Sequence, residues 1–377
     1  MLRVLHCIYD DPQNPWVGGG GSLRVWEIYR RLAARVEATV ATGSFPGAQD
    51  ETRDGVRYLR LGASSPYAWS RWSYARAATG LLARGDYDAA VFDFSVYTPV
   101  RLPAGRPVGV VVHMLHGPTA RDRWGKVVGG VVDAAERRSL HRARWISTTS
   151  RWMLDQLRPR LAPDARVELI GSGVPDEFAR VERQEERFLL YYGRFDFFQK
   201  GLDTLLRAFG RIVREYPDVE LCIAGRGKDE ERVRDLARDL GVEDRVRIYP
   251  DVERAEVLRL LSGALALLMP SRLEGLPMVP AEAMAAGVPV VATSVGAVPE
   301  VVDPPHGGIL VPPDDPAALA EAALGLLADG EHRAHLSDSA RLSARRFSWD
   351  SVAEQHLGFL QEIAAHGRQP STPGIVE

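Results

Sequence analysis

The stretch PSRLEGLPMVPAEAMAAGVPVVATSVGAVPE, Pro270–Glu300, gives the strongest indication of how this chain folds. An apolar run that ends at Ser271 predicts a buried strand, and Arg272–Leu276 follow it as a loop. A helix is expected to begin near Pro277, because proline is favoured in the first turn, and to end at Gly287, because glycine is favoured just past a helix end. The run VPVVATS then predicts another strand. Strand, helix and strand in this order predict a parallel sheet covered by helices.

The same alternation continues through the chain in both directions. The apolar runs are continuous rather than alternating, as expected for strands buried on both faces of a sheet. We therefore predict an α/β protein of two Rossmann-like domains, joined near Gly171–Arg187, where Gly, Pro and charged residues replace the apolar runs. The predicted divisions are 1–173, 174–346, a final helix over 347–365 and a tail over 366–377. The predicted strands are RVLHCIYD, ATVATG, AAVFDF, PVGVVVHML, ARWISTTS, RFLLYYGR, VELCIAG, RVRIYP, ALALLMPS, VPVVATS and GGILVPP.

Composition narrows the class of protein. The 377 residues are 45% hydrophobic and 26% charged, typical of a globular protein. No apolar run is long enough to cross a membrane, and the first residues do not form a signal peptide. Cys7 and Cys222 both lie in strand-like runs, which predicts buried free thiols and a cytoplasmic location.

Charge is divided unevenly along the chain. Residues 1–175 carry 24 Lys and Arg against 16 Asp and Glu, and the remainder carries 23 against 34. The excess favours contact between the first half and an anionic partner, such as a lipid surface at the inner face of the membrane, or it reflects two differently solvated surfaces. No basic cluster accompanies a nucleic-acid-binding motif, so we expect no nucleic-acid partner.

Two carboxylates in the opening stretch suggest a ligand site. Glu274 lies in the loop and Glu282 in the helix, so both flank a helix N-terminus at the carboxyl end of a parallel strand, where open α/β sheets bind ligands. Free N–H groups at a helix N-terminus suit a phosphate, and carboxylates suit sugar hydroxyls.

This stretch resembles the E-x7-E signature of the retaining glycosyltransferases of family 4, which have the GT-B fold. YYGRFDFFQKGLDTLLRAF and IAGRGKDEERVRDLARDLG resemble two further segments of that family, and GGGGSLRVWEIYRRLA resembles its glycine loop and first helix. The resemblance implies two domains facing a central cleft and transfer of a hexose-type sugar from a nucleotide diphosphate-sugar to a hydroxyl acceptor. It implies donor contacts by Gly19, Gly20, Arg194, Lys200, Glu274, Gly275, Leu276, Pro277, Met278 and Glu282. Arg194 and Lys200 would hold the diphosphate, Glu274 the sugar, and Glu282 the ribose.

The glycine loop has a separate interpretation from its own sequence. It follows a buried strand and opens an amphipathic helix, which favours a strand–loop–helix unit over a flexible tether. Arg24 stands where a dinucleotide-binding motif needs its third glycine, and no Walker motif follows. The loop by itself is either a phosphate-binding loop or a tight turn.

His113 lies near the end of the predicted strand PVGVVVHML and His116 just after it. The resemblance to family 4 implies that a histidine at such a strand end lies near the reacting sugar. The resemblance favours His113 as a catalytic residue alongside Glu274, Arg194 and Lys200, with His116 on the acceptor side. It implies retention without an enzymic nucleophile, so Glu274 would not act as a glycosidase acid or base. No cofactor or metal is expected, because no Cys/His cluster has zinc spacing.

Three classes of acceptor are compatible with the sequence: a glycan, a lipid-linked sugar and a small molecule. Trp69 and Trp72 are candidates for acceptor or membrane contact, or they belong to an ordinary amphipathic helix. The same fold class includes proteins with three other functions: a 2-epimerase acting on nucleotide-sugars, a nicotinamide-dependent oxidoreductase, and a non-catalytic sugar-binding module. The two glutamates disfavour the first, the incomplete dinucleotide motif the second, and the four charged residues together the third.

Overall fold

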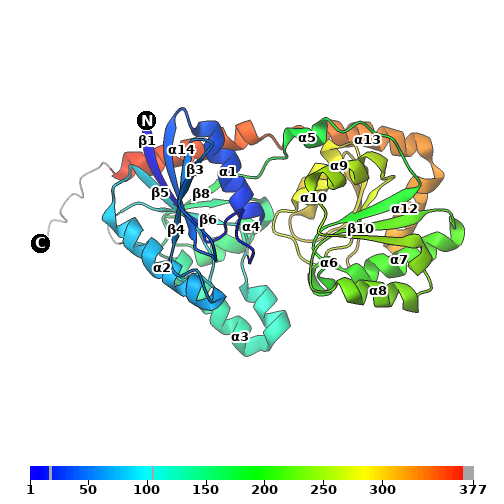
Figure 1. Cartoon of the computed structure of the whole chain (residues 1–377), viewed down its shortest axis with the longest axis horizontal. Helices are drawn as coiled ribbons and strands as arrows, with labels where there is room; N and C mark the ends of the chain where they lie inside the picture. The colour runs from blue at the N-terminus through cyan, green and yellow to red at the C-terminus, as the bar shows by residue number, and fades with distance from the viewer. Residues whose placement is uncertain (17–18, 104–105, 368–377) are drawn as a thin grey trace, which may run out of the picture. The chain divides into compact units, whose positions relative to one another are not determined.

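The computed structural model describes residues 1–16, 19–103 and 106–367. The chain forms two compact units, each with its own sheet (Figure 1). Unit 1 comprises Met1–Ser172 and the residues from Trp349 onward, and unit 2 comprises Gly173–Ser348. The tail predicted over 366–377 lies outside the described residues from 368 on. Among the helices of the described part, none is long and apolar enough to span a bilayer.

The sheet of unit 1 has eight strands in the order β3-β4-β2-β1-β5-β6-β7-β8. Neighbouring strands are parallel except β3 and β4, which pair antiparallel. The order places β1 beside β5 and β5 beside β6, so the carboxyl ends of these three strands meet at one edge. The strands are β1 (Leu2–Cys7), β2 (Val36–Gly43), β3 (Glu51–Arg53), β4 (Val56–Leu61), β5 (Ala89–Asp93), β6 (Gly109–Val112), β7 (Trp145–Thr148) and β8 (Arg166–Leu169).

Helices bury both faces of this sheet. One face packs under α1 and α14 in a core that includes Ile28, Tyr29 and Leu360. The other face packs under α2 and α4 in a core that includes Tyr74 and Met153. The helix α3 is kinked at Gly125, whose φ is +87°. The helices of unit 1 are α1 (Gly20–Leu32), α2 (Tyr67–Arg84), α3 (Gly117–Leu140), α4 (Arg151–Leu157), the 3-10 helix η1 (Arg158–Arg160) and α14 (Trp349–Gly367).

The sheet of unit 2 has six strands in the order β11-β10-β9-β12-β13-β14, and all its pairings are parallel. Its inner strands β9, β12 and β13 are buried and almost wholly apolar, as expected where helices cover both faces, whereas the edge strand β11 is only partly buried and contains Arg247. The neighbours β9 and β12 lie at the middle of the sheet, so the loops that follow them share one edge. The strands are β9 (Phe188–Tyr192), β10 (Glu220–Gly225), β11 (Val246–Pro250), β12 (Leu267–Met269), β13 (Val290–Thr293) and β14 (Gly308–Val311).

Two helical layers enclose this second sheet. One core contains residues of α7, α8 and α12, and the other contains residues of α5, α9, α10, α11 and α13. The helices are α5 (Asp176–Ala179), α6 (Phe197–Lys200), α7 (Leu202–Glu215), α8 (Glu230–Asp239), the 3-10 helix η2 (Glu243–Arg245), α9 (Arg254–Gly263), α10 (Met278–Ala285), α11 (Val298–Val302), α12 (Pro316–Ala328) and α13 (Gly330–Ala344).

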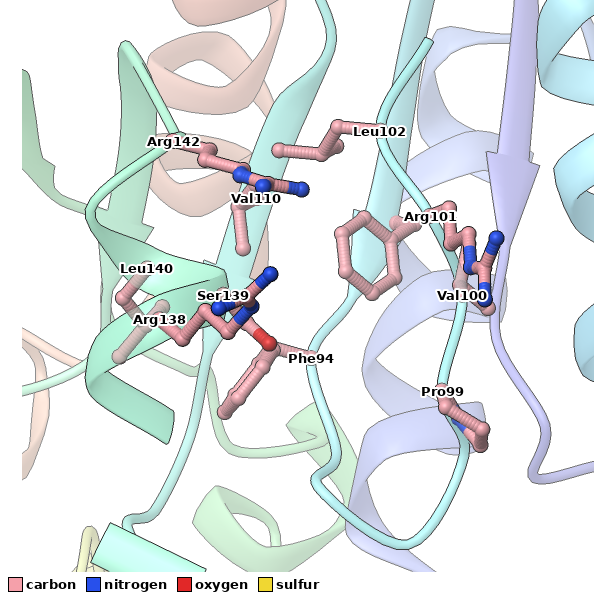
Figure 2. Close-up of a pocket in the computed structure, with 11 residues that line it drawn as sticks. Phe94, Pro99, Val100, Arg101, Leu102, Val110, Arg138, Ser139, Leu140 and Arg142 are labelled. Carbon is pink, nitrogen blue, oxygen red and sulfur yellow. The ribbon is translucent and has the colours of Figure 1, made fainter. Parts of the chain in front are cut away.

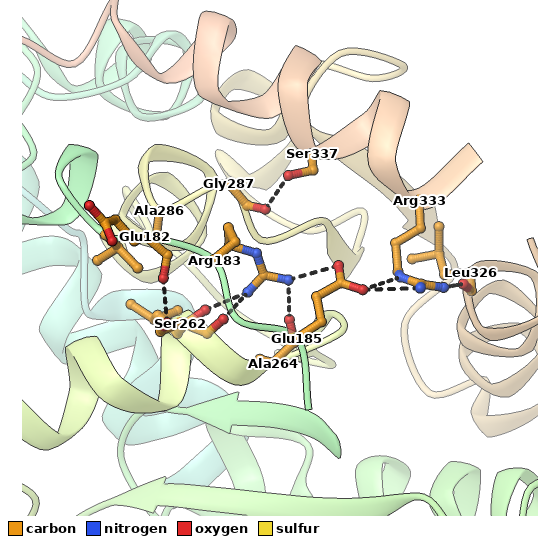
Figure 3. A network of polar contacts seen from close by, with 12 residues as sticks. Glu182, Arg183, Glu185, Ser262, Ala264, Ala286, Gly287, Leu326, Arg333 and Ser337 are labelled. Atoms are coloured by element: carbon orange, nitrogen blue, oxygen red, sulfur yellow. Dashed lines mark hydrogen bonds and ion pairs between the residues drawn. The ribbon is translucent and has the colours of Figure 1, made fainter. Parts of the chain in front are cut away.

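A polar network fastens the segment that leads into β9 (Figure 3). Arg183 donates to the carbonyls of Ser262, at 3.0 Å, and Ala264, at 2.5 Å, near the end of α9. It also pairs with Glu185, which in turn pairs with Arg333 of α13 at 3.1 Å. Carbonyls at a helix C-terminus lack intrahelical donors, so the guanidinium satisfies groups that would otherwise be unpaired. The entry to unit 2 is therefore held against two of its helices.

Candidate active site

The first candidate site lies in unit 2, where Lys200 and Glu274 form an ion pair. Lys200 Nζ lies 2.5 Å from Glu274 Oε1, and Ser271 Oγ donates to the same oxygen at 2.7 Å. The lysine side chain is 15% exposed and the glutamate side chain 7% exposed, so the pair is largely shielded from water. A shielded cation held this way is ready to stabilise negative charge on a ligand.

Two glycines allow this geometry. Lys200 ends α6, and Gly201 follows with φ +62°, where a Cβ would lie 2.1 Å from the carbonyl oxygen of Pro270. Gly296 has φ +53°, and its Cβ would lie 1.9 Å from the carbonyl oxygen of Glu274. A side chain at either position would push the loop after β12 away, because both neighbours are backbone. The lysine and the glutamate meet only because these loops approach so closely.

The helix α10 begins just beyond Glu274. Its N-cap is Pro277, which provides no side-chain cap for the first-turn N–H groups. The predicted donor contacts Gly275, Leu276, Pro277 and Met278 occupy the loop and the first helical residue. The positive end of the helix dipole therefore lies next to the Lys200–Glu274 pair, an arrangement that suits a phosphate.

Glu282 lies one turn further along α10 and is buried. Burial raises its pKa to about 7, against the opposing charge of Arg254. Arg254 Nη1 lies 3.8 Å from Glu282 Oε1, which is an ion pair but longer than a hydrogen bond. Within the described part of the chain, no hydrogen-bond donor reaches the Glu282 carboxylate, so it is available to a ligand hydroxyl.

Arg194 is exposed and follows β9. Its Nη2 donates to Gln199 Oε1 at 2.8 Å, and Gln199 Nε2 donates to the carbonyl of Leu273 at 3.2 Å. Gln199 thus connects Arg194 to the loop that carries Glu274. Gln199 was not among the predicted site residues, because it precedes Lys200 without a motif of its own.

A second cluster lies in unit 1, around Asp93 at the end of β5. His6 Nε2 lies 2.9 Å from Asp93 Oδ1, and His113 Nε2 lies 2.8 Å from Asp93 Oδ2. Burial alone would raise the pKa of Asp93, but the charges and hydrogen bonds of His113 and His6 hold it well below its usual range. Asp93 is therefore ionised and fixes the ring of His113, whose side chain is 33% exposed.

The contacts continue from His6 into the core. His6 Nδ1 lies 2.9 Å from Tyr29 Oη on α1, and Tyr29 Oη lies 3.3 Å from His356 Nε2 on α14. Burial raises the pKa of Tyr29 and lowers the pKa of His356. His113 is thus the exposed end of a chain of polar groups that reaches the C-terminal helix.

The glycine loop of unit 1 lies over two carboxyl groups. A Cβ on Gly21 would lie 3.8 Å from Asp93 Oδ2 and 3.9 Å from Asp10 Oδ2, and one on Gly19 3.6 Å from Asp10 Oδ2. Around Gly20, the N-terminal residue of α1, there is open space. Burial and the charge of Asp93 raise the pKa of Asp10 to about 6, and no described residue donates a hydrogen bond to its carboxyl. The space beside the loop therefore suits a ligand hydroxyl that can donate to Asp10.

The remaining predicted residues of unit 1 have other partners. His116 is the N-cap of α3, its ring lies 4.9 Å from that of Tyr97, and burial lowers its pKa. Trp69 and Trp72 stack on each other at 4.9 Å, and they are 51% and 49% exposed. Of the two histidines, His113 is the one that contacts Asp93.

Two family models match the chain. The model described as Glycosyl transferases group 1 matches residues 175–343, and the one described as Glycosyltransferase Family 4 matches residues 18–178. The chain is also 30% identical to the glycogen synthase of Mycobacterium tuberculosis (strain CDC 1551 / Oshkosh), over 93% of this chain and 92% of the relative. The chain belongs to glycosyltransferase family 4. This result confirms the resemblance stated from the sequence.

Further relatives of this family 4 glycosyltransferase differ in what they act on. The phosphatidyl-myo-inositol mannosyltransferase of Mycolicibacterium smegmatis is 26% identical over 85% of this chain and 80% of the relative. Among solved structures, sucrose-phosphate synthase from Thermosynechococcus elongatus has a TM-score of 0.82 at 23% identity and covers 97% of this chain and 100% of that chain. Anabaena HepE, solved with UDP-glucose, has a TM-score of 0.74 at 16% identity and covers 96% and 100%. These likenesses confirm the predicted GT-B fold.

The structure groups the predicted residues of this glycosyltransferase by unit. Lys200, Glu274 and the start of α10 come together in unit 2, with Arg194 linked to them through Gln199. In the part of the chain that the structure describes, no group of three or more His, Cys, Asp or Glu side chains is arranged to hold a metal ion. Sequence reasoning missed His6, Asp10 and Asp93, although each stands in or directly after a predicted strand.

Proposed function

We propose that this glycosyltransferase transfers a hexose-type sugar from a nucleotide diphosphate-sugar to a hydroxyl acceptor, with retention of anomeric configuration and without a metal. The observation that carries the proposal is the shielded Lys200–Glu274 pair beside the uncapped start of α10. Departure of a nucleoside diphosphate develops negative charge, and a fixed cation with helix N–H groups stabilises that charge. Arg194 adds a second cation on the adjoining loop.

The two glutamates fit different parts of the donor. Glu274 accepts hydrogen bonds from Lys200 and Ser271 on one oxygen, which leaves its other oxygen for a sugar hydroxyl. Such a carboxylate is a poor nucleophile, because the bound ammonium stabilises its charge. We assign Glu282 to the ribose hydroxyls. Retention would then follow from attack on the same face as departure, with the leaving phosphate oxygen accepting the acceptor's proton.

A nucleotide-sugar donor is also supported by a structural neighbour. HepE has been solved with UDP-glucose bound and with UDP bound. That chain shares the fold over 96% of the present one.

We place the acceptor on unit 1. Asp10 and His113 offer a carboxyl and an imidazole beside the open space at Gly20, and a sugar hydroxyl can bond to both kinds of group. One relative is named as a glycogen synthase and another as a phosphatidyl-myo-inositol mannosyltransferase. The proposed acceptor is therefore a glycan, a lipid-linked sugar or a small molecule. The exposed Trp69–Trp72 pair and the positive charge of residues 1–175 support contact with an anionic membrane.

The donor class is tested by thermal unfolding with UDP-, GDP-, ADP- and dTDP-sugars. A ligand present at a hundred times its dissociation constant stabilises the folded state by about 2.7 kcal/mol, so we expect one base to raise the melting temperature and the others to leave it nearly unchanged. The same panel with Glu282→Gln is the matched control, and its shift should be smaller. If no nucleotide-sugar shifts the wild-type transition, the donor assignment is wrong.

Metal independence is tested by transfer assays in EDTA. Because the proposal gives the charge of the leaving diphosphate to Lys200, Arg194 and α10, we expect turnover in excess chelator to equal turnover without it. Addition of Mn²⁺ or Mg²⁺ should change the rate less than twofold. Loss of turnover in EDTA, restored by one of these ions, would contradict this part of the proposal.

A further inference from the structure

Unit 1 contains a pocket of about 400 Å³ outside the candidate active site (Figure 2). It lies between the loop that follows β5 and the C-terminal end of α3. Its apolar wall includes Phe92, Phe94, Leu102 and Val110. The volume falls within the roughly 300–1,000 Å³ typical of small-molecule sites.

The pocket lies on one face of the unit 1 sheet, and the Asp93 side chain lies on the other face. Side chains alternate along a strand, so Phe92 and Phe94 point away from the face that carries Asp93. Both phenylalanines belong to the core under α2 and α4. A ligand here would therefore not compete for Asp10 or His113, although it would contact the strand that holds Asp93.

Three arginines border the apolar wall. Arg138 comes from the last turn of α3, Arg142 from just beyond the end of this helix, and Arg101 from the facing loop, and all three are exposed. Figure 2 shows the Arg138 and Arg142 side chains extending toward the loop that carries Pro99 and Val100. Within the described residues, no acidic side chain or carbonyl pairs with any of these three guanidinium groups. Elsewhere on α3 the neighbouring Arg137 is paired, with Asp133 at 2.8 Å.

The end of α3 itself works against an anion, because a helix C-terminus carries roughly half a negative charge. The full positive charges of Arg138, in the last turn, and Arg142, just past the end, together exceed that partial charge, and Arg101 adds a third from the other side. Guanidinium groups also match the planar oxygens of phosphate and carboxylate in bidentate contacts. The combination of an apolar wall with unpaired arginines at its border fits a ligand with an apolar chain and an anionic head.

We propose that this pocket binds a single-chain anionic amphiphile, with the apolar chain against Phe92, Phe94 and Val110 and a phosphate or carboxylate head on Arg138 and Arg142. The inference does not depend on the donor assigned to unit 2. It makes unit 1 able to recognise an acyl or isoprenoid phosphate or a fatty carboxylate. These sources share one chemistry, and the experiment separates them.

The test is calorimetric titration of the full chain with octyl phosphate, octanoate, octanol and inorganic phosphate. Each buried methylene tightens binding roughly fourfold, so octyl phosphate should bind more than a hundredfold tighter than inorganic phosphate. Octanol should bind at least tenfold more weakly than octyl phosphate, because it lacks the anionic head. Tighter binding of octyl phosphate than of octanoate would favour a phosphate lipid, and the reverse a fatty acid.

Two double variants separate the pocket from general charge. Arg138→Gln with Arg142→Gln should weaken octyl phosphate binding at least tenfold, and it should leave the melting temperature unchanged because both side chains are exposed. Arg121→Gln with Lys126→Gln removes the same charge from the other part of α3 and should leave binding unchanged. Equal binding of all four probes, or equal weakening by both double variants, would overturn the proposal.

Discussion

Replacing Lys200 by methionine is expected to lower the turnover of sugar transfer by about 10²–10³-fold, the range found when one preorganised charge-stabilising donor is removed. The Lys200 ammonium lies 2.5 Å from Glu274 Oε1 and beside the start of α10, and methionine keeps an unbranched side chain there without the charge. Turnover under saturating donor, rather than the apparent affinity alone, is the quantity that checks the prediction.

Replacing Lys200 by methionine should also lower the stability of unit 2. This effect must be distinguished from the direct loss of turnover. Glu274 is 7% exposed, and removing one partner of a shielded ion pair costs about 3–5 kcal/mol because the remaining charge is unpaired. The burial of both side chains therefore predicts a lower melting temperature for unit 2 in either single variant, Lys200→Met or Glu274→Gln.

The double variant Lys200→Met with Glu274→Gln is the control for this effect. It removes both charges together, so most of the lost stability should return, whereas transfer should stay at background. Arg187→Met is a matched surface control, because its partner Asp218 is 59% exposed and the pair contributes little. Turnover near the wild-type level in the double variant would refute the roles given to both residues.

Most strands of the two sheets could be predicted because they are continuous apolar runs. Each of the eleven predicted runs contains a strand. Three further strands, β3, β4 and β8, were not predicted. β3 is the three-residue strand Glu51–Arg53, and β8 alternates charged with apolar residues over Arg166–Leu169. Both lie at edges of the sheet, where pairing with one neighbour replaces burial and leaves little hydrophobic signal.

The residues of the candidate site likewise fall into those that could be predicted from the sequence and those that could not. Glu274 could be proposed from sequence because a buried strand, a loop and a helix start surround it, and Lys200 could be proposed from the resemblance to family 4. His6, Asp10 and Asp93 carry no such mark, since their meeting depends on the strand order that puts β5 between β1 and β6. The carboxyl-end rule for parallel sheets could have grouped Asp10, Asp93 and His113 once that order was assumed. A further indication of a site was His6, because it is a polar residue inside the first predicted buried strand.

Asp93→Asn is expected to lower turnover by about 10²-fold or more while leaving donor binding to unit 2 unchanged. Asn has one acceptor oxygen in place of two and an amide that donates, so it cannot accept from both His6 and His113. One imidazole must then change tautomer or rotate. Because His113 is the exposed end of the chain of polar groups, its ring orientation is lost with the second carboxylate oxygen.

Asp93 acts through His113 and is therefore a positioning residue, which calls for a readout that a structural role would not change. We expect kcat to fall with little change in the KM for donor, and ¹⁵N spectra to report a changed tautomer of His113. Asp88→Asn is the matched control, because Asp88 directly precedes the same strand and accepts from the backbone N–H of Arg3 at 2.9 Å. If Asp93→Asn shifts the melting temperature but keeps wild-type kcat, Asp93 serves only the fold of unit 1, and His113 does not need a fixed ring to take part in transfer.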